Sequence, residues 1–215
     1  MAYRETEKMR LRKAEIRQRI FDCAYQRVSE GGFRNAPINL VAEQAGVATG
    51  SVYRHFESKA ELFAEVFRRA TQIELDKVAT ALTGDEPALS RLEHALRQFA
   101  ERALRGPVMA WSLIAEPVDP RVEEERLNYR RSYAEFFERV ILEGVEAGSL
   151  PRQDAHLSAT CLVGALAESL VGPLSPPQQT AAAQHMPSAQ DSSWQKVLIE
   201  PIIDFCMQGV SGQRR

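Results

Sequence analysis

The sequence has few of the residues from which disulfide frameworks and metal sites are built. Its 215 residues include only three cysteines, Cys23, Cys161 and Cys206, which are widely spaced in apolar contexts and predict small buried side chains in a reducing cytoplasm. The four histidines are equally scattered, and the sequence contains no His-x-x-x-His or Glu-x-x-His pair. A di-metal carboxylate bundle therefore lacks its ligand spacing, and we expect neither a metal nor a cofactor.

Long apolar runs and the signatures of common enzyme classes are also missing. The longest apolar runs, such as residues 159–167, are shorter than the ~20 residues that span a bilayer. No apolar run follows the charged N-terminus, so we expect no secretory signal. There is no Gly-x-Ser-x-Gly elbow and no glycine-rich phosphate loop. These absences predict a cytoplasmic protein without a membrane span and argue against a hydrolase or a nucleotide-binding enzyme.

The charges are distributed unevenly along the chain. Residues 1–70 contain 13 Lys and Arg against 9 Asp and Glu, a net charge of +4. Residues 71–215 contain 14 against 20, a net charge of −6. A basic end on an acidic body suggests contact with a polyanion, but a solvated helix surface explains the same charges. Charge alone leaves both explanations open.

The periodicity of apolar residues predicts an all-α protein, because helical spacing recurs throughout and no strand-like alternation is present. Apolar residues every four positions from Ile16 to Val28 predict a first helix that ends at Gly31-Gly32. Ser58 and Glu61 form a capping box that begins a longer helix. The nine expected helices cover about residues 8–31, 38–45, 49–55, 58–83, 87–105, 107–115, 120–147, 154–171 and 194–209.

The second and third of these helices have the features of a helix-turn-helix motif. Ala42 is small enough for the close approach of two crossing helices, and Gly46 tolerates the positive φ that the tight turn needs. Val47 and Val52 fill the corner between the helices, which leaves the polar residues of the second helix facing outward. Those residues are of the types that contact phosphates and base edges in a major groove.

The stretch VAEQAGVATGSVYRHFESKAELF resembles the signature of the TetR/AcrR family of bacterial transcriptional regulators. The turn glycine, the Tyr-x-His-Phe and the following Ser-Lys-x-x-Leu occur in register, within a similarity that covers about residues 16–67. The resemblance implies an N-terminal arm with a three-helix DNA-binding domain over residues 1–57, and a helical ligand-binding and dimerisation domain over 58–215. It also implies a homodimer that binds a palindromic double-stranded DNA operator, most commonly as a repressor.

The resemblance further implies a set of DNA contacts. Within the predicted third helix, one set of residues would meet bases or the adjacent backbone, namely Thr49, Gly50, Ser51 and Arg54. Tyr53, His55 and Lys59 would contact phosphates, and the basic arm from Arg4 to Arg12 would reach along the DNA. Pro37 departs from the family pattern, because a Thr or Ser usually begins the first motif helix there and touches a phosphate. We expect Arg34 or Asn35 to compensate. The implied contacts are Thr49, Gly50, Ser51, Tyr53, Arg54, His55, Lys59 and Arg34.

In the body of the protein the resemblance implies a dimer interface and an effector pocket. Small and apolar residues in helices 154–171 and 194–209 favour a four-helix interface, although burial within one subunit explains the same pattern. Aromatic residues predict a small apolar effector, and residues 111–120 resemble those of regulators linked to acyl-CoA or fatty-acid metabolism. The candidate pocket residues are Phe99, Met109, Trp111, Ile114, Tyr129, Arg130, Tyr133, Phe137, Leu166 and Glu168.

Three alternatives stand beside a ligand-responsive regulator. A TetR-like protein that serves as a protein partner without binding DNA is disfavoured by the intact motif and the basic first domain. A helical enzyme would need Ser51 and His55 as a catalytic pair, yet no acidic residue is placed to orient the histidine. Binding of the basic arm to a membrane surface is disfavoured because the arm lacks a bulky apolar face.

Overall fold

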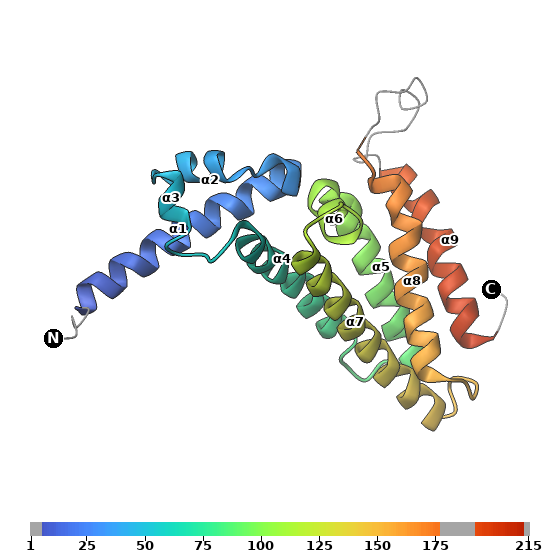
Figure 1. Ribbon diagram of the computed structural model, residues 1–215. Helices are drawn as coiled ribbons and strands as arrows, with labels where there is room; N and C mark the ends of the chain where they lie inside the picture. The colour runs from blue at the N-terminus through green and yellow to red at the C-terminus, as the bar shows by residue number, and fades with distance from the viewer. Residues whose placement is uncertain (1–5, 177–191, 213–215) are drawn as a thin grey trace, which may run out of the picture.

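The chain folds as an all-α protein, as the sequence predicted (Figure 1). The computed structural model describes residues 6–176 and 192–212, with the side chains of 192–194 excepted; Arg4 of the predicted arm lies outside these ranges. The described helices are α1 (Glu7–Gly31), the 3-10 helix η1 (Phe33–Asn35), α2 (Ile38–Gln44), α3 (Thr49–Val52), α4 (Lys59–Ala81), α5 (Ala88–Arg105), α6 (Pro107–Ile114), α7 (Pro120–Glu146), α8 (Ala155–Leu174) and α9 (Ser192–Ser211).

The third helix is shorter than the sequence indicates. A helix over residues 49–55 is expected, but only Thr49–Val52 are α-helical. Beyond them the chain tightens, because the N–H of Arg54 bonds to the carbonyl of Ser51 at 3.1 Å and that of His55 to the carbonyl of Val52 at 2.9 Å. These three-residue spacings are typical of a 3-10 turn. Tyr53, Arg54 and His55 therefore lie on a turn that follows α3.

The structure has two hydrophobic cores, and α4 contributes to both. The first core joins the second half of α1 with η1, α2, α3 and the stretch Leu62–Phe67 of α4. The second joins the C-terminal end of α4, from Val78, with α5, α7, α8 and α9. The division into domains at residue 57 stays a prediction, and the packing shows that the first turns of α4 belong with the N-terminal helices.

The N-terminal end of α1 extends away from both cores (Figure 1). Residues 6–15 are all exposed, and full burial begins at Ile20. The exposed turns carry Lys8, Arg10, Arg12 and Lys13. The described part of the predicted basic arm is thus a projecting helix, and its charged side chains are not covered by the two cores.

The start of α4 follows the predicted capping box with one difference. The N–H of Glu61 donates to Ser58 Oγ at 3.0 Å, as the motif requires. The Glu61 carboxylate, however, accepts from the N–H of Glu57 at 2.5 Å, one residue before the cap. The two bonds hold the turn after α3 against the first turn of α4.

The helix α8 corrects the expectation that every apolar stretch is too short to cross a membrane. By length and composition α8 is long enough, with a mean hydropathy of 1.5 over an 18-residue window of which 28% is buried. The sequence argument counted only uninterrupted apolar runs, whereas α8 reaches this hydropathy with residues such as Gly164 and Ser169 dispersed among apolar ones. The exposed side of α8 therefore needs an explanation.

Candidate DNA-binding surface, effector pocket and subunit interface

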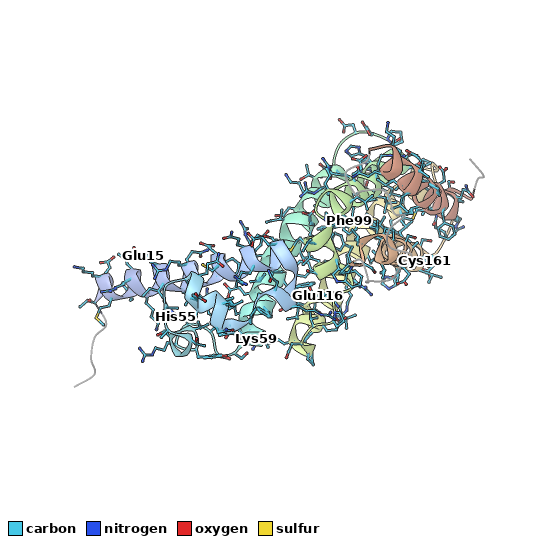
Figure 2. The ribbon with its side chains drawn as sticks, turned by 90° about the horizontal axis from the view of Figure 1, so that it is seen from above. Glu15, His55, Lys59, Phe99, Glu116 and Cys161 are labelled. Carbon is cyan, nitrogen blue, oxygen red and sulfur yellow. The ribbon has the colours of Figure 1, made fainter. Side chains whose placement is uncertain are left out.

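The predicted DNA-contacting residues form a polar surface around α3. Thr49, Gly50, Tyr53 and Arg54 are exposed, while Ser51 and His55 are half-buried. Val52 and Phe56, each 1% exposed, face the first core. Between these two anchors, which are one helical turn apart, Tyr53 and Arg54 point outward, whereas the His55 ring is partly covered. The labelled His55 and Lys59 lie among the N-terminal helices, away from the body that carries Phe99 and Cys161 (Figure 2).

The backbone of α3 is open to close approach from outside. Gly46 has φ +65°, the left-handed conformation that the turn between α2 and α3 needs. Gly50 has a different role, because a Cβ there would meet nothing within 4 Å. The packing of the protein itself therefore does not require glycine at residue 50. A surface approaching from outside, such as a DNA backbone, supplies a reason for it.

Arg34 and Lys59 are exposed, and both line a cleft next to the motif. The cleft is also lined by Phe33, Phe63 and residues 117–119. The ammonium of Lys59 lies 5.0 Å from the centre of the Phe63 ring, a cation–π contact that holds the first residue of α4 in place. Both predicted basic contacts therefore lie together at the N-terminus of α4.

Pro37 is the N-cap residue of α2 and provides no side-chain cap. Asn35, one of the two residues expected to compensate, is tied to α1: its carbonyl accepts from Arg27 Nε at 2.9 Å and its amide donates to the Arg27 carbonyl at 3.4 Å. Arg34 is exposed and lines the cleft. Of the two, Arg34 is the better placed to meet a phosphate.

Arg17 braces α1 against the motif. Its guanidinium donates to both Glu65 oxygens, at 2.9 and 2.5 Å, and its central carbon lies 4.4 Å from the centre of the Phe56 ring. One side chain thus links α1, α4 and the end of the motif. This brace sets the direction in which the exposed part of α1 projects.

A pocket in the body brings together most of the predicted effector contacts. Its cavity has a volume of about 100 Å³ and is enclosed by α4, α5, α6, α7 and α8. Two predicted residues are not on its wall: Trp111 packs against the second core, and Glu168 is exposed on the outer side of α8. The predicted residues that line it are Phe99, Met109, Ile114, Tyr129, Arg130, Tyr133, Phe137 and Leu166.

The polar groups of the pocket were mostly missed by the sequence prediction. Arg102 donates two bonds of 2.7 Å to Glu74, so that pair is satisfied. The Thr71 hydroxyl is buried without a hydrogen-bond partner among the described residues. Burial strongly raises the pKa of Tyr133, which therefore stays neutral. Thr71, Glu74 and Arg102 were not predicted as pocket residues. They lie on helices α4 and α5, and nothing in their spacing along the sequence distinguishes them from ordinary core and surface residues.

The helices α8 and α9 lie side by side at one end of the molecule (Figure 1), and both carry exposed apolar residues, which we call the apolar stripe. The exposed fraction is 59% for Leu157, 72% for Val197 and 69% for Phe205. Cys161 and Gly164 follow Leu157 at helical spacing on the exposed side of α8. Small and apolar residues on an exposed stripe are typical of a surface that another chain covers.

Residues 20–66, which form the first core and its motif, match the family model described as bacterial regulatory proteins, tetR family. The chain is a member of the TetR family. The match begins where α1 becomes buried and ends within the first half of α4.

Curated relatives resemble this TetR-family chain in the same region. It is 33% identical over 95 residues to the HTH-type transcriptional repressor KstR of Rhodococcus jostii strain RHA1, an alignment that covers 44% of each protein. It is 37% identical over 65 residues to an HTH-type transcriptional regulator of Staphylococcus aureus strain USA300, which covers 30% of this chain and 35% of the relative. The matched segment spans less than half the length of these relatives.

Solved structures extend the similarity of the fold over most of the TetR-family chain. The fatty acid degradation regulator FadR of Bacillus halodurans superimposes with a TM-score of 0.68 at 18% identity, over 89% of this chain and 94% of that one. FadR of Bacillus subtilis in complex with stearoyl-CoA has a TM-score of 0.66 at 15% identity, over 86% and 97%. At these identities the likeness concerns the fold alone.

The environment of His55 argues against the catalytic alternative in this TetR-family motif. Its Nδ1 is buried and has no hydrogen-bond partner within the described part of the chain, so no carboxylate is bound to that nitrogen as in a catalytic triad. Burial lowers the pKa of His55, and the cations Lys13, Arg17 and Arg54 lower it further. The ring is therefore neutral at neutral pH in the free protein.

We expect DNA binding to depend on pH through His55. A phosphate near the ring raises its pKa, so the bound state holds a proton that the free protein lacks. Affinity then increases as the pH falls through the bound-state pKa, and levels off below the free-state pKa. The gain is about tenfold for each pKa unit between the two states.

Fluorescence anisotropy with duplex DNA at fixed salt, from about pH 5 to 8, measures this dependence. His55→Gln should flatten the profile, whereas the exposed His94 on α5 provides the control variant His94→Gln. An unchanged profile in His55→Gln would show that the ring does not approach a phosphate.

Proposed function

We propose that this TetR-family protein is a cytoplasmic transcriptional regulator that represses its targets. It binds duplex DNA as a homodimer and releases it when a small apolar effector enters the pocket. The observation that carries the proposal is the outward surface of α3 and the following turn, where polar side chains surround a glycine that the protein's own packing does not require. This surface lies in the region that matches the family model.

The charges around the motif support DNA as the partner. Lys13, Arg17 and Arg54 lie close enough to His55 to lower its pKa, and the exposed end of α1 adds further basic residues. Clustered cations bind a phosphate backbone by releasing its counterions. The affinity for DNA should therefore fall steeply as the salt concentration rises. Binding of a protein partner to the same surface would not require this, so the salt dependence of binding separates the two hypotheses.

The exposed stripe of α8 and α9 supports a second copy of the chain as the other partner. Burial of its apolar residues within one subunit, the alternative that the sequence left open, does not hold for Leu157, Val197 and Phe205. A twofold axis across the stripe would pair the two helices of each subunit in a four-helix interface. It would also place two motifs on one side of the dimer, as a palindromic site requires.

The pocket supports an apolar effector with a hydrogen-bonding group. Aromatic and aliphatic side chains form most of its wall, and Thr71 presents an unpaired hydroxyl. An acyl chain fits this pattern, and the FadR structure with stearoyl-CoA shares the fold. A cavity of about 100 Å³ is smaller than the ~300–1,000 Å³ of ordinary ligand sites, so binding must move the surrounding helices.

DNA selection from a genomic pool, followed by binding titrations at several salt concentrations, tests the DNA contacts. Lys59→Ala should weaken binding to all sequences and reduce the salt slope by about one, because it removes a phosphate contact. Arg54→Ala should cost about 1–3 kcal/mol and relax the sequence preference, because it removes a base contact. Arg69→Ala, an exposed arginine on α4, is the control. Binding without a salt slope or a preferred sequence would contradict the proposal.

The effector proposal predicts that acyl compounds stabilise the protein and release it from DNA. Thermal unfolding and DNA titration with octanoic acid, palmitic acid and palmitoyl-CoA measure the two effects. Thr71→Val should weaken acyl binding about 2–10-fold, since it removes one hydrogen bond from the pocket. Thr80→Val, on the exposed side of α4, is the matched control. A panel that changes neither stability nor DNA affinity rules out this class of effector.

The interface proposal predicts a monomer when a charge is placed on the exposed stripe. Phe205→Glu should dissociate the dimer at micromolar concentration, because a carboxylate buried at the twofold contact loses its hydration. Leu142→Glu introduces the same charge at a residue of α7 that is 45% exposed and should leave the dimer intact. Sedimentation velocity distinguishes the two, and a wild-type monomer would exclude the interface.

A further inference from the structure

Glu116 joins the body of the protein to the DNA-binding domain by side-chain hydrogen bonds. Its carboxylate accepts from the backbone N–H of Phe33 at 2.9 Å and from that of Arg34 at 3.1 Å. The residue is only 2% exposed. Figure 2 shows it at the junction between the N-terminal helices that carry His55 and the body that carries Phe99. The contact holds η1, the turn that connects α1 to α2.

The end of α1 is shaped to accommodate this carboxylate. Gly32, between α1 and η1, has φ +76°, and a Cβ there would lie 2.6 Å from an oxygen of Glu116. Any side chain at residue 32 would be strained and would also displace the carboxylate. Glycine is therefore needed at residue 32 for two reasons: the backbone conformation at the end of α1 and the space that the Glu116 carboxylate occupies.

The backbone of Glu116 is bound on its other side to the walls of the pocket. Its N–H donates to the carbonyl of Trp111 at 3.0 Å, which ties it to the C-terminal end of α6. Its carbonyl accepts from Arg126 Nη2 at 2.8 Å. Arg126 is buried on α7 and also donates from Nε to the carbonyl of Leu113 at 3.0 Å. Arg126 and Leu113 both line the pocket.

Movement of α6 therefore moves η1. A buried carboxylate that loses its hydrogen bonds is strongly unfavourable, so Glu116 keeps its two backbone donors when the pocket walls shift. Leu113 and Ile114 line the pocket and precede Glu116 by only a few residues, so the short backbone segment between them must move with them. The displacement of η1 moves Arg34, which is one of its residues, and passes to the start of α2 in the helix-turn-helix motif.

We propose that Glu116 is a positioning residue, whose carboxylate sets the position of Arg34 and α2 according to whether the pocket is filled. The inference rests on the proposed function, because it names the route by which that pocket controls the DNA-binding surface. The route is separate from α4, which connects the two cores through its own length. The brace between Arg17 of α1 and Glu65 of α4 lies on that other route and provides the matched control.

The first experiment compares Glu116→Gln with Glu65→Gln. A glutamine at residue 116 keeps the size of the side chain, but its NH2 faces one of the two backbone donors. The measurement is the ratio of DNA dissociation constants with and without palmitoyl-CoA, which for the wild type should lie in the ~5–150-fold range of ordinary coupling. In Glu116→Gln the ratio should fall below about twofold, while its affinity for palmitoyl-CoA in the absence of DNA stays within about threefold.

Glu65→Gln should retain the wild-type ratio even if its DNA affinity is lower. The comparison of the two variants distinguishes coupling from a loss of stability. If Glu116 had only a structural role, Glu116→Gln would lower the affinities for DNA and palmitoyl-CoA but leave the ratio of DNA dissociation constants unchanged. Retention of the full wild-type ratio in Glu116→Gln would overturn the inference.

The second experiment needs neither DNA nor an effector. Ala110→Met fills the pocket from α6 with a flexible side chain and stands in for occupancy. Hydrogen exchange of the amides of residues 33–41 should change by about fivefold or more in Ala110→Met relative to wild type. The same substitution in a Glu116→Gln background should change it by less than about twofold.

An equal change in both backgrounds, or no change in either, would overturn the inference. If the exchange experiment succeeds while the wild type fails to bind DNA or to respond to palmitoyl-CoA, the proposed function fails and the coupling through Glu116 stands. The two conclusions are thereby tested apart.

Discussion

The arrangement of the molecule depends on the burial of both ends of a single helix in two different cores. The 23 residues of α4 pack against the N-terminal helices through Leu62–Phe67 and against the body from Val78 onward. A helix of this length transmits displacement and rotation because its backbone bonds leave it little freedom to bend between its ends. The motif and the pocket are therefore mechanically connected even before any polar contact is considered.

Two buried charged side chains add specificity to that connection. Arg126 and Glu116 are 7% and 2% exposed at the place where α6 ends and α7 begins. Each is satisfied mainly by backbone groups, so their positions follow the helix ends and not other flexible side chains. A buried charge with fixed partners tolerates few alternative packings, which limits how the two cores can slide over one another.

The sequence predicted the helices well because their signals are local. Capping residues, glycines at helix ends and apolar spacing indicated the helices and most of their bounds, and Ser58 caps α4 as its motif predicts. The short α3 was missed because its end depends on the burial of Phe56, a tertiary contact. The projection of polar residues from α3 was inferred from the burial of Val47 and Val52, and in the structure Thr49, Gly50, Tyr53 and Arg54 are exposed.

The pocket was predicted less completely, for a physical reason. Aromatic residues of α5 and α7 stood out by type, whereas Thr71, Glu74 and Arg126 have polar types that usually lie on a surface. Glu168 shows the converse, since its position on α8 is separated from the pocket by the width of that helix. Which side of a helix faces inward depends on neighbours that are distant in the sequence. The hydrogen bond between Glu116 and the N–H of Phe33 could not be predicted for the same reason, because the two residues are 83 positions apart.

The small volume of the cavity has a consequence for timing. A cavity of about 100 Å³ is too small for a molecule as long as an acyl chain, so the walls must separate for such a molecule to fit. Association with sites that must open is slower than the ~10⁵–10⁷ M⁻¹s⁻¹ of preformed surfaces. The same enclosure slows escape, so a bound effector would remain after its concentration outside has fallen. Under the proposed function, such an effector would keep the protein off DNA for a time after the supply of effector has ended.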